Sequence, residues 1–496
     1  MPEGEASRRR DLIFIFALGL LFRLVLLLIF PVPYGNDSAG RFFFRDQIWL
    51  AHWLPATQVL VYCSYAVSHS VVIVRLVFAV VGSLAGVAFT FYLQTFARRR
   101  TALIGGMLFT TNSLLVFLSL MPYQETVFLG LLFGSLAFFI RDETRGRSSL
   151  AAFALYGLAC LTRYEAWFIL PALLWRIIRR AVAAPNPLMA REAAINLLGL
   201  GWGPAVWMLA NWQQWGSPTA FLFFRADHAL YAWAPHAEIM RIVSYTGWML
   251  YWIGRFGSPL VVLALPGLCL VWKNRKTLLA VLWPALLLCG LELIFLIFIA
   301  GREFATANRF ASMPLSVTLI FVAFGAEAAM TRVQSAMPSW QQKLVQPKFK
   351  LIVAGLFTAF LLIYGAVPIA QAGRLPEFRV PYEIVKFLEA HLPANERVLI
   401  VAESLDGAVP MPYQRIAGQL DLARDRLLCA AFIDSNSLGE VEAFVRERSL
   451  RYLVVFGGEW PRRGSDEIFL QLAANPQQKK KIVFSSNAAI VYELKP

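Results

Sequence analysis

The sequence is poor in the residues that build disulfide frameworks and metal sites. It has only five cysteines and five histidines in 496 residues, and it contains no CxxC, HExxH or clustered His/Cys motif. Cys160, Cys269 and Cys289 lie in apolar runs, where a small apolar side chain is the simplest interpretation. The remaining two, Cys63 and Cys429, are isolated and do not make a framework. We therefore expect no disulfide scaffold, and no cofactor or divalent metal is implied.

Charged residues are also scarce. They make up 16% of the chain, whereas hydrophobic residues make up 58%, which is the composition of a polytopic α-helical membrane protein. Many apolar runs have the length of about 15 to 25 residues that crosses a hydrocarbon core. Eleven transmembrane helices are predicted, near 12–30, 71–96, 102–120, 126–140, 148–162, 166–178, 193–211, 245–272, 277–300, 310–330 and 351–371. The fourth to sixth are short, which is compatible with one tilted, re-entrant or half-buried pair.

Acidic residues are fewer than basic ones, 31 against 46, and the basic residues gather on one side of the predicted spans. They occupy the loops near 8–10, 98–100, 141–147, 176–180, 273–276 and 332–350. By the positive-inside rule this side is cytoplasmic, so the N-terminus is inside and the C-terminus is outside. These loops explain most of the net charge of +15, so no nucleic acid partner is implied. The first run keeps Arg23 and lacks a small-residue cleavage site, which predicts a retained span.

A different composition begins after about residue 375. PYEIVKFLEAHL, SLGEVEAFVRERS and a segment near 465–474 have helical patterns, while RVLIVA, RYLVVF, KKIVFSS and AAIVYEL have strand patterns. This alternation predicts a soluble α/β domain with a partly parallel sheet, over 376–496, after a transmembrane domain over 1–375. The segment lacks a GxGxxG motif, a P-loop and a nucleophile elbow. Its simplest role is a structural or acceptor-docking cap on the outer face.

The loop over 31–70 is long and unusually apolar for an outer loop. Aromatic and aliphatic residues alternate there with Arg41, Arg45, Asp46 and His52, a mixture typical of helices that lie flat at a membrane interface. Asp37 stands at the entrance of this loop, where the chain leaves the first span. An aspartate in the sequence NDS is also good turn and helix-cap chemistry. Both readings, a functional carboxylate and a cap, are therefore open for Asp37.

Further acids are predicted at the same outer side. Glu125 follows Pro122 and begins a helix, where an acid is favourable in itself, and Glu165 has Arg163 two residues before it, which permits a simple ion pair. Glu292 lies inside an apolar run and can pair with an arginine of another helix. Arg302 and Arg309 lie on the same predicted face. Together these residues form a mixed acid and arginine site, suited to an anionic leaving group and an acceptor that must lose a proton.

The order of these features resembles the GT-C glycosyltransferases, polytopic membrane enzymes that use polyprenyl-phosphate sugars. This superfamily includes protein O-mannosyltransferases and the aminoarabinose transferases of lipid A. The resemblance covers about residues 10–330 and includes the aspartate of the first outer loop, matched by Asp37. The other similar segments are HWLP, VVIVRLVFAVVGSLAG with Arg75, MPYQETVFLGLLFGSLAFF with Glu125, LTRYEAWFILP, WGSP, and REFATANRFASMPLSVTLIFVAFG. Relatives often have D-E where this loop has N-D-S, which leaves open whether Asp46 shares the role.

The resemblance implies a bacterial inner-membrane glycosyltransferase whose donor is a polyprenyl-phosphate sugar and whose partners are that lipid and an acceptor lipid, glycan or protein. Inverting transfer needs one general base, which Asp37 can supply. Arg302 and Arg309 would bind the donor phosphate, with Arg75 and Arg163 as reserves. Glu125 would orient the acceptor or hold an arginine. Retaining chemistry, which needs a nucleophile beside a second acid, is less favoured.

Other classes of protein also carry acids and arginines in membranes. A transporter or lipid flippase would show broken helices in matching halves and charges near the bilayer midplane, and no inverted repeat is evident here. A polymerase or ligase acting on diphosphate-linked glycans would show a large late outer loop, which is missing. A scaffold would use the acids only as caps and ion pairs. The sequence specifies neither the sugar nor the acceptor.

Overall fold

The computed structural model describes the main helices and the sheet of the chain. The described residues are 3–29, 36–49, 53–143, 149–183, 187–220, 239–273, 282–292, 308–336, 347–372, 374–393 and 396–401, then 416, 426–429, 443–445, 447–448, 450–456, 480–486 and 489–494. They form two compact units. The first comprises Met1–Leu28, Trp49–Leu60 and Leu76–Pro368, and the second Ile29–Ile48, Val61–Arg75 and Ile369–Pro496. The boundary expected between 375 and 376 stays a prediction.

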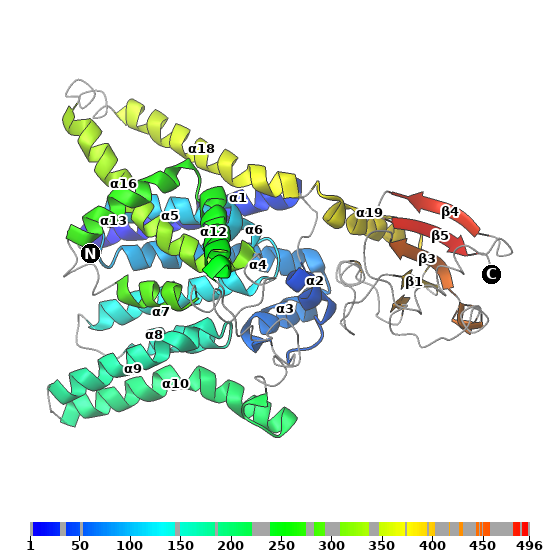
Figure 1. Cartoon of the computed structure of the whole chain (residues 1–496), viewed down its shortest axis with the longest axis horizontal. Coiled ribbons are helices and arrows are strands. Elements are labelled where there is room, and N and C mark those ends of the chain that lie inside the picture. Colours follow the sequence, from blue (N-terminus) through cyan, green and yellow to red (C-terminus); the bar gives the residue numbers. More distant parts are fainter. Residues whose placement is uncertain are drawn as a thin grey trace. The chain divides into compact units, whose positions relative to one another are not determined.

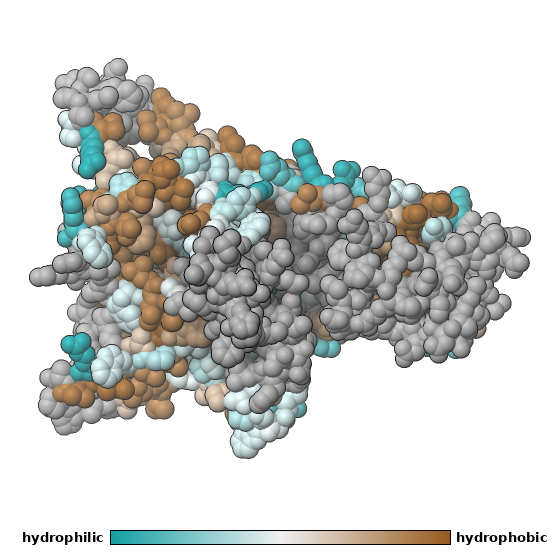
Figure 2. Space-filling model, viewed as in Figure 1, coloured by the Kyte–Doolittle hydropathy of each residue, from teal (hydrophilic) through white to brown (hydrophobic). Residues whose placement is uncertain are grey.

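The first unit is a bundle of long apolar helices. Among the described residues, five helices are long and apolar enough to cross a membrane: Glu5–Ile29, Val71–Leu93, Gln124–Asp142, Arg309–Ser335 and Leu351–Gln371. Leu150–Cys160 and Leu282–Glu292 are shorter apolar helices. Figure 2 shows apolar residues over much of the visible face of this unit, with hydrophilic residues at helix ends. These helices indicate an integral membrane protein. The count of eleven spans stays a prediction.

Most predicted spans correspond to a helix. The bundle contains α1 (Glu3–Ile29), α4 (Val71–Leu93), α5 (Arg99–Thr111), α6 (Ser113–Phe117), α7 (Gln124–Glu143), α8 (Leu150–Cys160), α9 (Glu165–Ala183), α10 (Pro187–Trp215), α12 (Ile239–Phe256), α13 (Ala264–Lys273), α16 (Ser312–Ala336) and α18 (Pro347–Ala372) (Figure 1). The 3-10 turns η2 (Pro259–Leu263) and η3 (Asn308–Ala311) precede α13 and α16. The rest of the predicted span 277–300, beyond Glu292, lies outside the described residues.

Two predicted spans are broken. The run 245–272, expected as one helix, bends by 111° between α12 and η2–α13, and Figure 1 shows α12 standing across the other long helices. At the bend Ser258 has a positive φ of 65°, and a Cβ on Gly257 would lie 2.5 Å from the carbonyl oxygen of Ile253. The run 102–120 breaks at Asn112, whose side chain caps α6 and donates to the carbonyl of Phe256 at 2.7 Å. Hydropathy detects neither break, because both halves are apolar.

Small residues let helices of the bundle approach closely. A Cβ on Gly267 in α13 would lie 1.8 Å from the carbonyl oxygen of Phe321 in α16, and one on Gly325 would lie 1.9 Å from the carbonyl oxygen of Leu263. The two glycines therefore face each other across the α13–α16 contact. Close backbone approach through small residues is a common way to pack helices in lipid, where association gains little from the hydrophobic effect.

A buried arginine joins α1 to the α5–α6 break. Arg23 is fully buried; its Nε donates to Ser119 Oγ at 2.6 Å, and its Nη1 donates to the carbonyls of Gly19 at 3.1 Å and Thr110 at 3.0 Å. The Thr110 carbonyl belongs to the C-terminal turn of α5, where the helix dipole favours a positive charge. Arg23 is thus held by neutral acceptors, which explains how an apolar helix accommodates it.

The second unit contains the mixed sheet that the sequence predicted. The strands are β1 (Arg397–Val401), β2 (Leu427–Cys429), β3 (Leu450–Phe456), β4 (Lys480–Ser485) and β5 (Ala489–Leu494), in the order β2-β1-β3-β5-β4. β1 pairs in parallel with β2 and β3, whereas β3–β5 and β4–β5 are antiparallel. The short strand β2 was not predicted. Most of the helix expected over 437–449, and all of that near 465–474, lie outside the described residues.

One face of the sheet is covered by α19 (Pro376–His391), the helix predicted from PYEIVKFLEAHL. Ile384 and Leu388 of α19 are fully buried in one core with Val398 and Ile400 of β1. Phe43, at the end of α2 (Asn36–Phe43), packs against the same core. Part of the segment 31–70 therefore belongs to the compact unit of the sheet. The loop also forms α3 (Pro55–Ser68), so its helical character is confirmed, while its flat position at a membrane interface stays a prediction.

Candidate functional site

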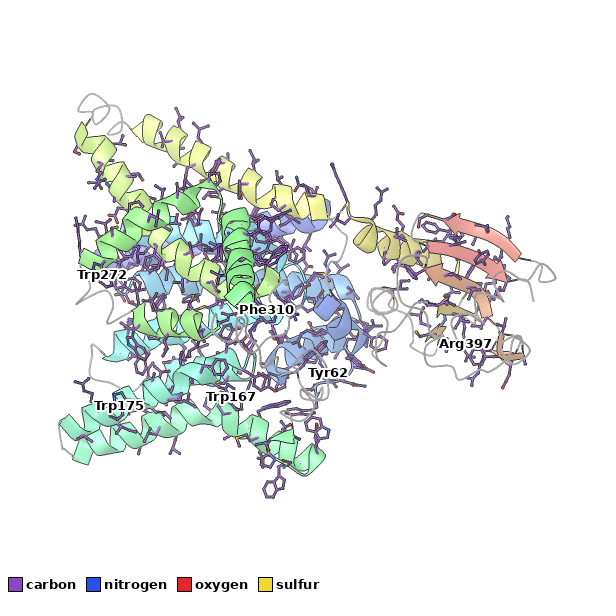
Figure 3. All side chains as sticks on the ribbon, in the orientation of Figure 1. Tyr62, Trp167, Trp175, Trp272, Phe310 and Arg397 are labelled. Atoms are coloured by element: carbon purple, nitrogen blue, oxygen red, sulfur yellow. The ribbon has the colours of Figure 1, made fainter. Side chains whose placement is uncertain are left out.

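The turn between α8 and α9 carries the centre of the candidate site, Arg163. Two hydrogen bonds brace this turn: Tyr156 Oη donates to the carbonyl of Ala166 at 2.7 Å, and Trp167 Nε1 donates to the carbonyl of Cys160 at 2.9 Å. Both bonds join the last turn of α8 to the first turn of α9. Figure 3 shows Trp167 in this region. The backbone that carries Arg163 is therefore fixed by side chains from both helices.

Arg163 forms ion pairs with two glutamates. Its Nη1 lies 2.5 Å from Glu125 Oε1, and its Nε and Nη2 both donate to Glu165 Oε1, the former at 2.9 Å. Glu125 is the second residue of α7 and Glu165 is the first residue of α9, so each carboxylate also faces the positive end of a helix dipole. The structure thus brings together Glu125, Arg163 and Glu165, which the sequence suggested separately. The guanidinium of Arg163 is bound by the two carboxylates.

The cluster is buried. Side-chain exposure is 3% for Arg163, 1% for Glu125 and 15% for Glu165, so the ion pairs act at low dielectric and the arginine is protected from water. Burial disfavours the charged guanidinium, but the attraction of Glu165 and Glu125 outweighs it and raises the pKa of Arg163 above its ordinary value. Glu292, itself buried at the end of its helix, also interacts electrostatically with Arg163. The arginine therefore serves as a permanent cation for a group of acids.

Aromatic rings connect Arg163 to Arg309. The Arg163 guanidinium carbon lies 5.4 Å from the ring centre of Phe310 and 5.9 Å from that of Phe128. Arg309 lies 5.0 Å from the same Phe310 ring, so two guanidinium groups share one aromatic side chain. Phe310 is labelled in Figure 3, beside α12. The half-buried Arg309 in η3 therefore shares an aromatic contact with Arg163, while its role at the site stays a prediction.

The sequence analysis missed Phe128 and Phe310. Both are phenylalanines in apolar runs, and the chain contains 39 phenylalanines, so nothing in composition or spacing distinguishes these two. A weak signal existed for Phe310 alone, because it directly follows Arg309. Their contribution follows from the attraction between a cation and the face of an aromatic ring.

Three other candidate residues are found in the second unit. Asp37 is the second residue of α2, Asp46 is exposed in the turn that follows, and the buried Arg75 lies in the first turns of α4. All three are part of the second unit. In that unit the Arg45 guanidinium lies 4.5 Å from the ring centre of Tyr65, which connects the end of α2 to α3. Arg302 lies outside the described residues.

The cluster supports proton transfer and anion binding by protein side chains. Carboxylates held by a buried cation can accept hydrogen bonds from hydroxyl or amino groups, and Arg309 can donate to an oxyanion. Within the part of the chain that the structure describes, no three His, Cys, Asp or Glu side chains are placed to hold a metal ion. The glutamates around Arg163 instead share a guanidinium.

Known structures share this fold. The crystal structure of ArnT from Cupriavidus metallidurans bound to undecaprenyl phosphate superposes with a TM-score of 0.59 at 13% identity, over 97% of each chain. Its apo form gives 0.57 with the same coverage and identity. The oligosaccharyltransferase AglB from Archaeoglobus fulgidus, in complex with an inhibitory peptide and a dolichol-phosphate, gives 0.50 at 12% identity, over 92% of this chain and 70% of AglB.

These likenesses concern three-dimensional structure alone. The chain matches no protein-family model, and no curated protein sequence matches it. The likeness to ArnT extends over nearly the whole of both chains and shows a shared fold.

Proposed function

We propose that this protein is a glycosyltransferase that moves a sugar from a polyprenyl-phosphate donor to an acceptor hydroxyl on the outer face of the membrane. The observation that carries this proposal is the buried Arg163 cluster with Arg309 beside it, in a fold shared with two glycosyltransferase structures that contain polyprenyl phosphates. In this proposal the protein lies in a bacterial inner membrane, with its N-terminus in the cytoplasm and the α/β domain outside.

The phosphate of the donor is assigned to Arg309, together with Arg302. Arg163 is less suited to this role because its donors engage Glu125 and Glu165. Arg309→Ala should weaken donor binding by about 1.5–3 kcal/mol, the range for hydrogen bonds to charged groups. Arg309→Lys should restore only part of the loss, because the planar fork is absent. Unchanged donor affinity in Arg309→Ala would move the phosphate to Arg302 or Arg75.

The general base is assigned to Asp37. An inverting transfer breaks the bond between the anomeric carbon and the phosphate oxygen, forms a bond to the acceptor oxygen, and passes the acceptor proton to a carboxylate. Asp37 stands in the first turn of α2, directly after the first span, where a lipid-borne donor and an aqueous acceptor can meet. Glu125 and Glu165 would hold Arg163 as a fixed charge in the bundle.

The experiment combines a donor panel with one substitution. Purified protein is incubated with polyprenyl-phosphate sugars that carry different hexoses and pentoses, and release of the carrier phosphate is measured together with the anomeric configuration of the product. Asp37→Asn should leave donor binding intact and lower turnover by about 10²–10⁴-fold. Asp46→Asn is the matched control from the same loop and should cost less.

The panel and the variants separate the parts of this proposal. Normal turnover in Asp37→Asn combined with an inactive Asp46→Asn would assign the base to Asp46. Full activity in Asp37→Asn, Asp46→Asn and Glu125→Gln would refute a carboxylate base. A product with retained configuration would refute inversion.

A lipid transporter or flippase is the second candidate. The bent pair α12–α13 favours it, because broken helices are frequent in transporters. This class predicts movement of a labelled polyprenyl-phosphate lipid across vesicles that contain the protein, without sugar release. Sugar release without lipid movement would decide for the transferase.

A further inference from the structure

An exposed tryptophan stacks against the bundle close to the Arg163 turn. The rings of Trp49 and Trp207 are 6.1 Å apart between centres and 19° from parallel. Trp207 is fully buried, whereas Trp49 keeps 41% of its surface exposed. Trp49 therefore packs against Trp207 while a large part of its surface is accessible.

Three contacts tie this tryptophan pair to the candidate site. Trp207 Nε1 donates to Tyr164 Oη at 3.1 Å, and Tyr164 stands between Arg163 and Glu165 in the chain. The segment that follows Trp49 also lies on this turn: the amide of Ala56 donates to the carbonyl of Leu161 at 2.9 Å, and Leu54 is buried with Leu161 and Trp207. The position of Trp49 is thus set by the same turn that positions Arg163.

The chemistry of this surface matches a sugar ring. A pyranose or furanose has one face of C–H groups, which pack on the electron-rich face of an aromatic ring, and hydroxyl groups at its edge. The Glu165 side chain retains 15% exposure, so one carboxylate that can accept hydrogen bonds from sugar hydroxyls lies two residues from Arg163 in the turn that anchors the platform.

We propose that Trp49, backed by Trp207, is a stacking platform for the sugar ring of the lipid-linked donor. The inference rests on the proposed function and deepens it by naming a residue that recognises the sugar rather than its carrier. Trp49 is a binding residue in this proposal and takes no part in proton transfer. An alternative occupant is the lipid surface, because tryptophans are also enriched at membrane interfaces.

The test compares glycosylated lipids with the bare carrier phosphate. Titration calorimetry on the full-length protein in nanodiscs measures the affinities for mannosyl-phosphoryl undecaprenol, for its glucosyl and aminoarabinosyl forms, and for bare undecaprenyl phosphate. Trp49→Ala should weaken binding of the best glycosylated lipid by roughly 2- to 13-fold, as expected for loss of one aromatic contact, and should leave the bare carrier unchanged. Trp49→Phe keeps a ring and should recover most of the affinity.

Trp212→Ala is the matched control. Trp212 is another tryptophan of the bundle, in α10 with Trp207, and is 61% exposed. The Trp212→Ala protein should bind the glycosylated lipid and the bare carrier with wild-type affinity. An equal loss for both lipids in Trp49→Ala would assign Trp49 to lipid and overturn the proposal. An unchanged affinity for the glycosylated lipid would overturn it as well.

The design separates this inference from the proposed function. If binding of the glycosylated lipid depends on Trp49 but no sugar is transferred, the stacking platform is supported and the glycosyltransferase function is refuted. Transfer that is insensitive to Trp49→Ala would retain the transferase and refute the platform. A wild-type protein that binds the glycosylated lipid no better than the bare carrier would also refute the platform.

Discussion

Removal of Arg163 should destabilise the protein more than removal of either glutamate. Arg163 and Glu125 are both nearly inaccessible to water, and Glu165 is only slightly exposed. Arg163→Met would leave the two glutamates buried without their cation, and loss of one partner of a buried ion pair costs about 3–5 kcal/mol. Glu125→Gln removes one charge while Arg163 keeps Glu165, so the expected cost is about 1–3 kcal/mol, that of one perturbed buried hydrogen bond.

A double-mutant cycle measures the interaction itself. In Arg163→Met combined with Glu125→Gln, the amide at position 125 carries no charge that needs the arginine. The double variant should therefore be more stable than the sum of the single effects predicts, with a coupling of about 0.5–3 kcal/mol. Reversible unfolding in mixed micelles gives the three free-energy changes on one scale. Glu383→Gln, which removes an exposed ion pair to Arg379 in the second unit, is the control and should cost less than about 1 kcal/mol.

Two results would refute this reasoning. Additive costs in the double variant would mean that Arg163 and Glu125 do not interact in the folded protein. A smaller loss of stability for Arg163→Met than for Glu125→Gln would mean that the two carboxylates do not need Arg163 because another positive charge already balances them.

Two further changes test the packing of the bundle. Gly325→Val should destabilise it by at least about 1–3 kcal/mol through overpacking against α13, whereas Gly201→Ala, where a Cβ meets nothing within 4 Å, should unfold at nearly the wild-type temperature. Arg23→Met leaves the carbonyls of Gly19 and Thr110 without this donor, so it should cost about 1–3 kcal/mol in the same unfolding measurement while donor affinity stays at the wild-type value.

The apolar helices and the sheet could be predicted because both depend on local pattern. Runs such as 71–96 and 351–371 are long enough to cross a membrane on their own. Apart from one arginine each, the strands at 397–401 and 450–456 consist of aliphatic and aromatic residues at both faces. β2 has only three residues, too few for a periodic signal. The bend between α12 and α13 was not predicted because Gly257 and Ser258 are two residues in a uniformly apolar run.

The site could be predicted only in part, because the sequence reveals residue types but not partners far apart in the chain. An ion pair between Arg163 and Glu165 could be predicted because the two residues are only two positions apart. Glu125 lies 38 residues before Arg163, and nothing in the spacing identifies it as the second partner. The stacking of Trp49 on Trp207 is more distant still, and it depends on a segment of the first loop that packs against the bundle.

Arg23 and Arg163, both buried in the bundle, differ in a way that bears on function. Arg23 donates to a hydroxyl and two carbonyls, neutral groups that bring no charge of their own, while its Nη2 has no hydrogen-bond partner among the described residues. These bonds join α1 to the segment of α5 and α6. Arg163 is instead shared by two carboxylates. A surplus of acids around one cation is unfavourable in a low-dielectric interior unless a further positive charge or a proton donor stands nearby. Arg309 contacts the same Phe310 ring as Arg163 and brings such a charge. This grouping of acids and arginines, which Arg23 lacks, is the physical reason to look for chemistry at Arg163 rather than at Arg23.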